Sequence, residues 1–309
     1  MLKFQQDGKI VDKIEALEIK QLELLKTVIH CKKEIGMIYK REIFEKLSNH
    51  IVQANETINP EVKAYIDGYS GPFSQALKEN YKIAEAEKLP LCQDTGIVEF
   101  FVFLGNEVVL EEPIFTTLNE VVEKVYAENP FRFSVVNDPL FERKNTKNNT
   151  PPVVHIFQIS GKSLEIKFLV KGGGSENLSA LFMLKPSIRA QELKDVIIGH
   201  VKENGAKGCP PLHVGIGIGG TSDKAMILSK LALTKSFKER NQNPTYADFE
   251  EELLKDLNTL NIGFQGLKEG VSVFSVHIEY APTHIATLPV GVSLDCYLCR
   301  KGVVKFESK

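Results

Sequence analysis

The chain has 309 residues, roughly twice the length of a typical domain, and its 43% hydrophobic content is ordinary for a soluble globular enzyme. Its 38 basic and 40 acidic residues give a formal net charge of -2, so the chain lacks the net positive charge that nucleic-acid or anionic-membrane binding normally requires. The amino terminus has scattered charges and no signal-like apolar stretch, so we expect a cytoplasmic protein with no nucleic-acid or membrane partner.

The first ninety residues are predicted to be helical. Apolar residues recur at helical spacing between 14 and 28, and a second set continues the pattern at Ile43, Leu47 and Ile51. Pro60, Pro90 and the turn region at 68–72 divide this part into separate short helices.

After Pro90 the pattern becomes β-rich. Runs of β-branched and aromatic residues predict strands at 98–104, 153–159, 164–170, 213–218, 273–280 and 285–294. Helical periodicity between several of them predicts helices at 187–204, 221–233 and 247–260, with Thr221 or Ser222 and Thr245 as N-caps. The predicted class is α+β, a single domain over 1–309 with a helical part at about 1–90 and a mixed β-sheet with covering helices at about 91–309.

Five cysteines, an odd number without an export signal, make a disulfide framework a poor interpretation. Cys92 lies between the helical part and the first strand, Cys209 lies between a glycine and two prolines, and Cys296 ends a strand. Soft thiolates favour zinc, copper(I) and iron–sulfur centres, so three cysteines in pre-shaped loops could hold a four-iron cluster and leave one iron open. The alternative is that they are buried small hydrophobic residues.

The other two cysteines carry weaker signals. Cys296 and Cys299 form a C-x-x-C pair that could be a zinc half-site or a redox dithiol, but no second C-x-x-C completes a zinc site and no thioredoxin-like context surrounds it. Cys31 is most simply a core or surface thiol.

Two glycine-rich segments could approach a ligand. Gly215–Gly220 contains G-x-G-x-x-G, the form of a dinucleotide fingerprint, but the second strand that should carry an acidic residue is missing. The start of the following helix could still bind a carboxylate. Lys171–Asn177 holds three consecutive glycines and is either an anion-binding loop or a flexible loop.

Five motifs, taken together, resemble the class I iron–sulfur fumarases, in the same order over about residues 85–302. More narrowly, the chain resembles the alpha subunit of a two-subunit fumarase or L-tartrate dehydratase. The motifs are Cys92-Gln-Asp-Thr-Gly96, Lys171-Gly-Gly-Gly-Ser-Glu-Asn177, Gly208-Cys-Pro-Pro211, Gly219-Gly-Thr221 and the segment from His284-Ile-Ala-Thr-Leu-Pro-Val290 through Cys296.

The resemblance implies a [4Fe-4S] cluster held by three cysteine ligands, with one iron open: Cys92, Cys209 and Cys296. It also implies that Asp94 and His284 are catalytic and that the substrate is bound by Gln93, Arg132 and the backbone of Gly173. An arginine fork suits a carboxylate, and an aspartate beside a cluster ligand can exchange protons. Without the resemblance, Arg132 could be a surface ion pair, Asp94 a loop cap and His284 a satisfied sheet histidine.

The implied activity is that of a hydro-lyase which converts fumarate and water to malate, with L-tartrate dehydration to oxaloacetate as the alternative. A non-catalytic iron–sulfur or zinc-binding protein is the alternative of another class. Single-chain relatives continue into a further domain, so a beta subunit that carries the rest of the site, in an α2β2 assembly, is expected. The chain departs from the family after Gly263-Phe-Gln-Gly266, where it reads Leu-Lys-Glu-Gly-Val-Ser, and at the extra Cys299.

Overall fold

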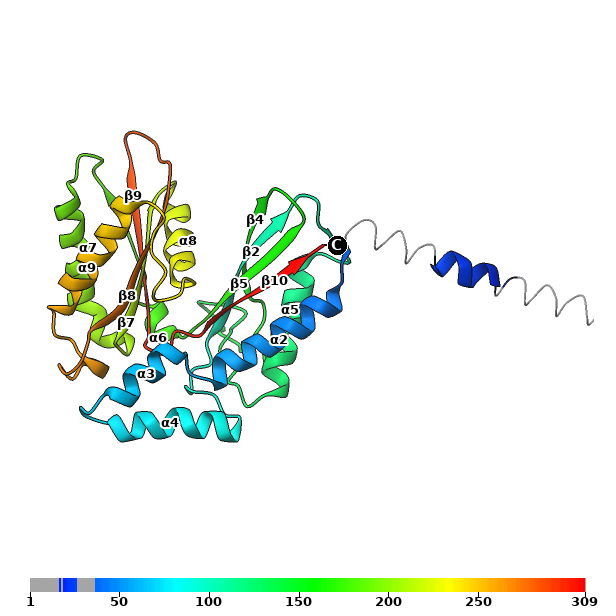
Figure 1. The fold of residues 1–309 in the computed structure, drawn as a ribbon, viewed down its shortest axis with the longest axis horizontal. Coiled ribbons are helices and arrows are strands. Elements are labelled where there is room, and N and C mark those ends of the chain that lie inside the picture. Colours follow the sequence, from blue (N-terminus) through cyan, green and yellow to red (C-terminus); the bar gives the residue numbers. More distant parts are fainter. Residues whose placement is uncertain (1–16, 18, 27–36, 309) are drawn as a thin grey trace, which may run out of the picture.

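Two four-stranded sheets and the helices that cover them make up most of the molecule (Figure 1). The computed structural model describes residues 17, 19–26 and 37–308. It confirms the predicted α+β class, with a helical part before the sheets. The strands form two mixed sheets and not the single sheet that the sequence pattern predicts, because strands distant along the chain pair with each other.

The first sheet joins the carboxyl-terminal segment to the middle of the chain. Its order is β10 (Lys301–Glu307), β5 (Ser163–Lys171), β2 (Ile97–Gly105) and β4 (Val153–Ile159), and only the β2–β4 pair is parallel. Two helices pack on one face, α2 (Lys40–Glu56) and α5 (Ile114–Glu128). The predicted apolar stripe of α2, Ile43, Leu47 and Ile51, is buried there, and each such side chain stabilises the fold by about 1.5–3 kcal/mol.

The second sheet carries the strand ends on which the candidate site depends. Its order is β6 (Ala180–Leu184), β9 (Leu288–Asp295), β7 (Leu212–Gly219) and β8 (Val273–Ala281). Two helices cover one face, α7 (Ala190–Asn204) and α9 (Pro244–Asn258), and α8 (Ser222–Leu233) covers the other (Figure 1).

Helix α8 lies between the two sheets. Its last residue, Leu233, is buried against Phe101 of β2 and Leu169 of β5. The layers therefore run from α7 and α9 through the second sheet, α8 and the first sheet to α2 and α5 (Figure 1). Within the described part of the chain, no helix combines the length and apolar character needed to cross a membrane.

Two further helices, α3 (Pro60–Gly68) and α4 (Ser74–Glu87), lie below both sheets in Figure 1. α3 and α9 begin alike, because the capping side chains of Asn59 and Asn243 accept backbone N–H bonds at 2.8 and 3.0 Å and a proline follows each. The prediction of Thr245 as an N-cap is therefore wrong, since Asn243 holds that position. Thr221 is the N-cap of α8, as predicted.

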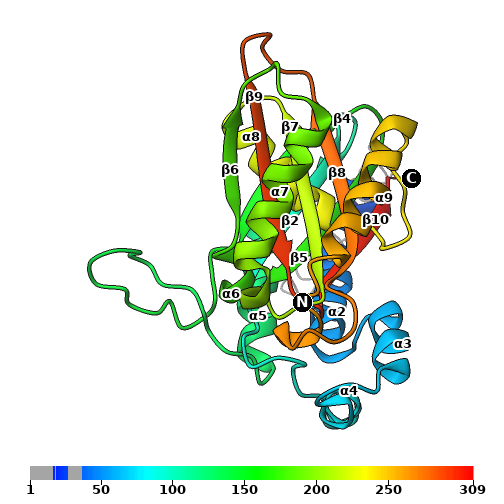
Figure 2. The same ribbon diagram turned by 90° about the vertical axis from the view of Figure 1, so that its left-hand side faces the viewer.

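The remaining elements are short. β1 (Met37–Ile38) pairs with β3 (Val109–Leu110), and three short helices lie in connections: α6 (Gly173–Glu176), η1 (Gly205–Gly208) and η2 (Phe264–Gly266). The strand predicted at 285–294 begins only at Leu288, because the Thr287 amide closes a turn onto the His284 carbonyl at 2.9 Å. Figure 2 shows the long connection between α5 and β4 extending away from the body.

Candidate functional site

Three cysteines from distant parts of the chain meet at one end of the second sheet. Cys92 lies in the loop between α4 and β2, Cys209 lies in the turn between η1 and β7, and Cys296 directly follows β9. Because β7 and β9 are antiparallel, with His213 at the start of β7 opposite Asp295 at the end of β9, Cys209 and Cys296 lie at the same end. The backbone N–H of Tyr297, which follows Cys296, donates to the Cys209 carbonyl at 3.2 Å.

Tyr297 lies close to all three cysteines. Burial raises the pKa of Tyr297, and the charges of Cys296, Cys92 and Cys209 raise the pKa further, an effect that requires all three thiols to be near its hydroxyl. Cys92 and Cys296 also pack against one apolar cluster, which residues of α3 and α4 form together with Leu298. The three sulfurs are therefore gathered around one tyrosine.

The three thiols differ in exposure. Cys209 is exposed and has a φ of 53°, in the left-handed region, whereas Cys92 and Cys296 are half-buried. Loss of solvent raises the pKa of Cys209, and it raises the pKa of Cys296 to about 12, where Asp295 adds to the effect and Arg300 opposes it. Metals bind the thiolate, so a bound metal group would act against this effect of burial on the two thiols.

The donor set fits an iron–sulfur cluster better than a single metal ion. Among the described residues, no three His, Cys, Asp or Glu side chains lie near enough to one another to hold one ion. Thiols spread around a tyrosine suit a larger group whose ligands bind different metals, and soft thiolates favour iron–sulfur centres. Cys299 is buried, and burial raises its pKa to about 12. Cys31 lies outside the described residues.

Asp94 is held between two backbone amides. Its Oδ1 accepts from the Gly96 N–H at 3.0 Å and its Oδ2 accepts from the Gly173 N–H at 2.9 Å. A Cβ at Gly172 would lie 2.9 Å from Oδ2, so a glycine there lets the turn approach this closely. The triple-glycine segment therefore forms the start of α6, and one of its amides binds a carboxylate of the chain itself.

Arg132 is fixed beside Gln93. Its Nη1 donates to Gln93 Oε1 at 3.0 Å, and the Thr95 hydroxyl accepts from the Arg132 N–H at 2.9 Å and donates to the Arg132 carbonyl at 3.0 Å. Both Arg132 and Gln93 are exposed, so the guanidinium keeps further donors that face solvent. Such a fork can bind a carboxylate in bidentate geometry.

Two buried groups support this loop from inside. The Tyr126 hydroxyl of α5 donates to the Thr95 carbonyl, and burial raises its pKa, so it remains a donor. Asn149 Nδ2 donates to the Gly96 carbonyl at 3.0 Å, while its Oδ1 accepts from the Ser134 N–H at 2.6 Å. Sequence reasoning missed both residues, because neither carries a local signal that separates it from a packing or loop residue.

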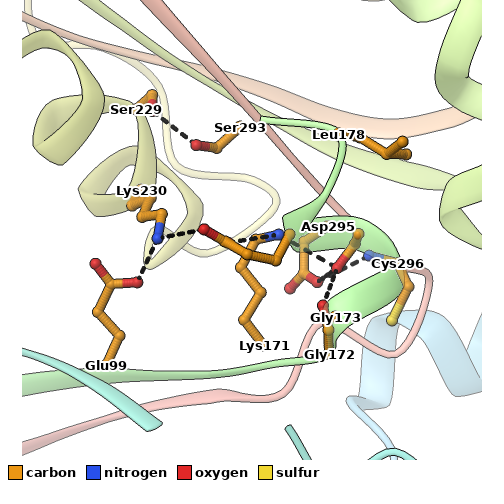
Figure 3. A network of polar contacts seen from close by, with 12 residues as sticks. Glu99, Lys171, Gly172, Gly173, Leu178, Ser229, Lys230, Ser293, Asp295 and Cys296 are labelled. Carbon is orange, nitrogen blue, oxygen red and sulfur yellow. Dashed lines mark hydrogen bonds and ion pairs between the residues drawn. The ribbon is translucent and has the colours of Figure 1, made fainter. Parts of the chain in front are cut away.

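A series of charged groups runs behind the glycine turn (Figure 3). Lys171, only 1% exposed, pairs with Glu176 at 3.2 Å, and Glu176 pairs with Lys230 of α8 at 2.8 Å. Lys230 also pairs with Glu99 of β2 at 3.0 Å, and Glu99 contacts His155 at 2.8 Å. Lys171, Lys230 and Glu99 therefore each have an oppositely charged partner, which offsets the cost of their burial, and the pairs join the first sheet to α8.

Asp295 links the glycine turn to the third cysteine (Figure 3). Its Oδ1 accepts from the Cys296 N–H at 2.9 Å and from the Ser175 hydroxyl at 3.2 Å. Lys171 in turn donates to the same hydroxyl at 3.3 Å. These contacts fix the backbone of Cys296 relative to α6.

His284 lies far from this group in the same chain. It is exposed in the loop before β9, and the eight residues of that strand separate the loop from Cys296. With Thr221 and Lys224 it lines a separate pocket of about 710 Å³. The chain thus brings together all the other predicted site residues: Cys92, Gln93, Asp94, Arg132, Gly173, Cys209 and Cys296.

The Gly215–Gly220 segment is not a nucleotide loop. Gly215 and Gly217 lie inside β7, where a Cβ would meet carbonyl oxygens of α8 at 2.0 and 1.9 Å, so they serve the packing of α8 on the sheet. The sequence predicts that the start of α8 could bind a carboxylate. In the structure this helix end lines the pocket of His284, away from the cysteines.

Comparisons with known proteins agree on one family. The sequence profile of the fumarate hydratase (Fumerase) family matches residues 45–305. A Methanocaldococcus jannaschii protein named "Putative L(+)-tartrate dehydratase subunit alpha" is 41% identical over 244 residues, which cover 76% of this chain and 85% of that protein. The L(+)-tartrate dehydratase subunit alpha of Escherichia coli strain UTI89 is 33% identical over 221 residues, covering 71% and 73%. The protein of the same name from Shigella sonnei is 33% identical over 217 residues, covering 70% and 72%.

Proposed function

Because the chain belongs to the fumarate hydratase (Fumerase) family, we propose that it is the cluster-binding alpha subunit of a hydro-lyase that acts on a small dicarboxylate. The observation that carries the proposal is the meeting of Cys92, Cys209 and Cys296 beside Asp94. The three cysteines would hold a [4Fe-4S] cluster with one iron open. When bound, such a cluster supplies a Lewis acid that polarises the carbon–oxygen bond of the substrate.

Arg132 and Gln93 would bind and orient the substrate. The guanidinium already donates one N–H to Gln93 Oε1, and its remaining donors face solvent next to the cysteine loop. A dicarboxylate held there by one carboxylate would present its reacting carbons to Asp94. Thr95 keeps this arrangement fixed, since its hydroxyl bonds both backbone groups of Arg132.

Asp94 would exchange a proton with the substrate. Each of its oxygens accepts one backbone N–H, so each keeps a lone pair for a further partner. The Gly173 amide would act at the same place by orienting Asp94. Removal of a proton from a carbon next to a carboxylate requires a base in fixed geometry. The amides of Gly96 and Gly173 would hold Asp94 in that geometry.

The rest of the acid–base machinery would come from other chains. His284 can act at this site only from a neighbouring copy, because β9 separates it from the cysteines of its own chain. The relatives are named as alpha subunits, which supports a beta subunit as the partner. That subunit would complete the site, in an α2β2 assembly.

Two substrates suit this chemistry. Reversible hydration of fumarate to malate follows the family description, whereas the names of the relatives favour dehydration of L-tartrate to oxaloacetate as the second candidate. Malate and L-tartrate both carry two carboxylates and a hydroxyl on the carbon next to one of them, and fumarate is the alkene diacid that malate leaves when it loses water.

The test is an anaerobic assay of the reconstituted chain with its beta subunit on malate, fumarate and L-tartrate. We expect turnover of one of them, and a change in the visible spectrum of the cluster when that substrate binds. A full cluster with no turnover and no spectral response would instead support the non-catalytic iron–sulfur alternative.

A further inference from the structure

Arg300 is a buried arginine without a carboxylate partner. It lies in the chain between Cys299 and the start of β10, and it is 4% exposed. Nη1 donates to Asn55 Oδ1 at 3.0 Å, and Nε has no hydrogen-bond partner. Among the described residues, no carboxylate oxygen lies within 4.0 Å of the guanidinium. A buried charge with only a neutral amide as partner is costly, so the fold keeps this cation for a reason that its own side chains do not supply.

One end of the guanidinium lies beside the glycine turn that holds Asp94. A Cβ at Gly172 would lie 2.9 Å from Asp94 Oδ2 and 3.7 Å from Arg300 Nη2, so both side chains end beside the same glycine. Arg300 also follows Cys296 by four residues, through a turn in which the Cys299 N–H donates to the Cys296 carbonyl at 3.1 Å.

Asn55 holds the guanidinium without cancelling its charge. This residue of α2 is fully buried, and its Nδ2 donates to the Ile51 carbonyl at 2.9 Å, which directs Oδ1 at Arg300. An aspartate of the same shape would form a neutral ion pair with Arg300. The two acids nearby, Asp94 and Asp295, lie beyond ion-pairing distance of Arg300. Asp94 accepts backbone N–H groups instead, and Asp295 accepts the Cys296 N–H and the Ser175 hydroxyl.

We propose that Arg300 is the internal counter-ion of the iron–sulfur cluster, a positioning residue whose permanent charge offsets the negative charge of the three cysteine thiolates and of the cluster sulfides. A guanidinium stays protonated at any working pH, so the compensation does not depend on conditions. Net charge and nearby dipoles set the reduction potential of such clusters. Arg300 therefore raises the reduction potential of the cluster and slows its loss. This inference rests on the proposed function.

The experiment compares four full-length proteins, each reconstituted anaerobically with iron and sulfide: the wild type, Arg300→Met, Arg300→Lys and Asn55→Asp. Two properties are measured, the midpoint potential of the cluster by spectroelectrochemical titration and the rate at which a chelator removes iron. Arg189→Met is the matched control, because Arg189 is an exposed arginine at the start of α7 whose side chain pairs with Glu192.

Arg300→Met should shift the midpoint potential to a more negative value and speed iron loss by roughly tenfold, the effect typical of a lost outer-sphere partner. Asn55→Asp should act in the same direction because it neutralises Arg300 without removing it, and Arg300→Lys should stay near the wild type. Asn55→Asp also keeps the test decisive if Arg300→Met does not fold.

The stability of the cluster-free proteins, measured by unfolding, distinguishes a counter-ion role of Arg300 from a purely structural role. A counter-ion leaves the cluster-free Arg300→Met protein as stable as the wild type or more stable, because the uncompensated charge is gone. A less stable cluster-free variant whose cluster has an unchanged potential would overturn the inference, and so would variants that match Arg189→Met in both cluster measurements. If the wild type itself takes up no cluster, the proposed function fails together with the inference.

Discussion

Replacing Asp94 with asparagine distinguishes proton transfer from positioning at the candidate site. The carboxylate accepts the Gly96 N–H on one oxygen and the Gly173 N–H on the other, at 3.0 and 2.9 Å. Asparagine keeps the shape but only one acceptor oxygen, so one amide loses its partner. For the buried Gly96 amide this costs about 1–3 kcal/mol in stability, and for the exposed Gly173 amide less, since water can replace the carboxylate. Asparagine also cannot take up a proton, which removes about 10²–10⁴-fold in turnover, or about 3–5 kcal/mol in the barrier.

The assay measures turnover and iron content in the same sample of the reconstituted complex. Asp138→Asn is the matched control, because the Asp138 carboxylate also accepts backbone N–H groups, from residues 140–142, but in the connection that extends away from the body. We expect Asp94→Asn to keep its iron and lose turnover, while Asp138→Asn keeps both. An Asp94→Asn protein with full iron and wild-type turnover would refute the proton-transfer role.

Three further predictions concern the fold. Burial lowers the pKa of His277 to about 3, so below its ordinary value of 6.5 only the unfolded chain binds a proton there, and stability falls as the pH falls. Between pH 7 and pH 5 His277 should lower the free energy of unfolding by about 2 kcal/mol. Urea unfolding at the two pH values should show a decrease that is smaller by this amount in His277→Leu than in the wild type. An equal decrease in the two proteins would contradict the assignment. Gly217→Ala places a Cβ 1.9 Å from a carbonyl oxygen of α8 and should lower the free energy of unfolding by about 3 kcal/mol or more. Gly199→Ala on α7 is the control, because its Cβ would meet nothing within 4 Å and the change should not destabilise the chain. Equal urea midpoints for the two variants would contradict this. Lys171→Met removes one of the two cations that pair with Glu176, and it should lower the free energy of unfolding of the cluster-free chain by about 2 kcal/mol. This is less than the loss of a fully buried pair costs, because Glu176 is partly exposed. Unchanged stability would show that the pair is not stabilising.

Local sequence patterns predicted where strands begin and end better than they predicted which strands pair with each other. The strands β2, β4, β5, β7 and β8 were found almost to the residue, since each is a run rich in β-branched or aromatic side chains, whereas β3 and β6 were not predicted. β10 was missed although Val304 and Phe306 are buried and Val303 and Lys305 are exposed, an alternation visible in the sequence. Its pairing with β5, which divides the strands into two sheets, depends on contacts between distant segments that no local pattern encodes.

The candidate site shows the same division. Cys92, Asp94 and Cys209 stand in short motifs with glycines and prolines, and it was the resemblance of these motifs to a known family that selected them. Residue types alone left the two cysteines open as buried small hydrophobic residues and Asp94 as a loop cap. Tyr126 and Arg300 are chosen by the fold, because a tyrosine on an apolar helix face and an arginine after a cysteine become informative only when their burial and neighbours are known. His284 shows the reverse case, a motif residue that its own chain places away from the site.

The central claim is that Cys92, Cys209 and Cys296 together hold one four-iron cluster. The most direct measurement is the iron and sulfide content of the anaerobically reconstituted chain and of its single cysteine-to-serine variants. The account predicts about four irons per chain in the wild type and in Cys299→Ser, and loss of the cluster in each variant of the three site cysteines. A wild-type chain that takes up no iron, or a Cys299→Ser variant that loses its iron while the three site variants keep theirs, would contradict it.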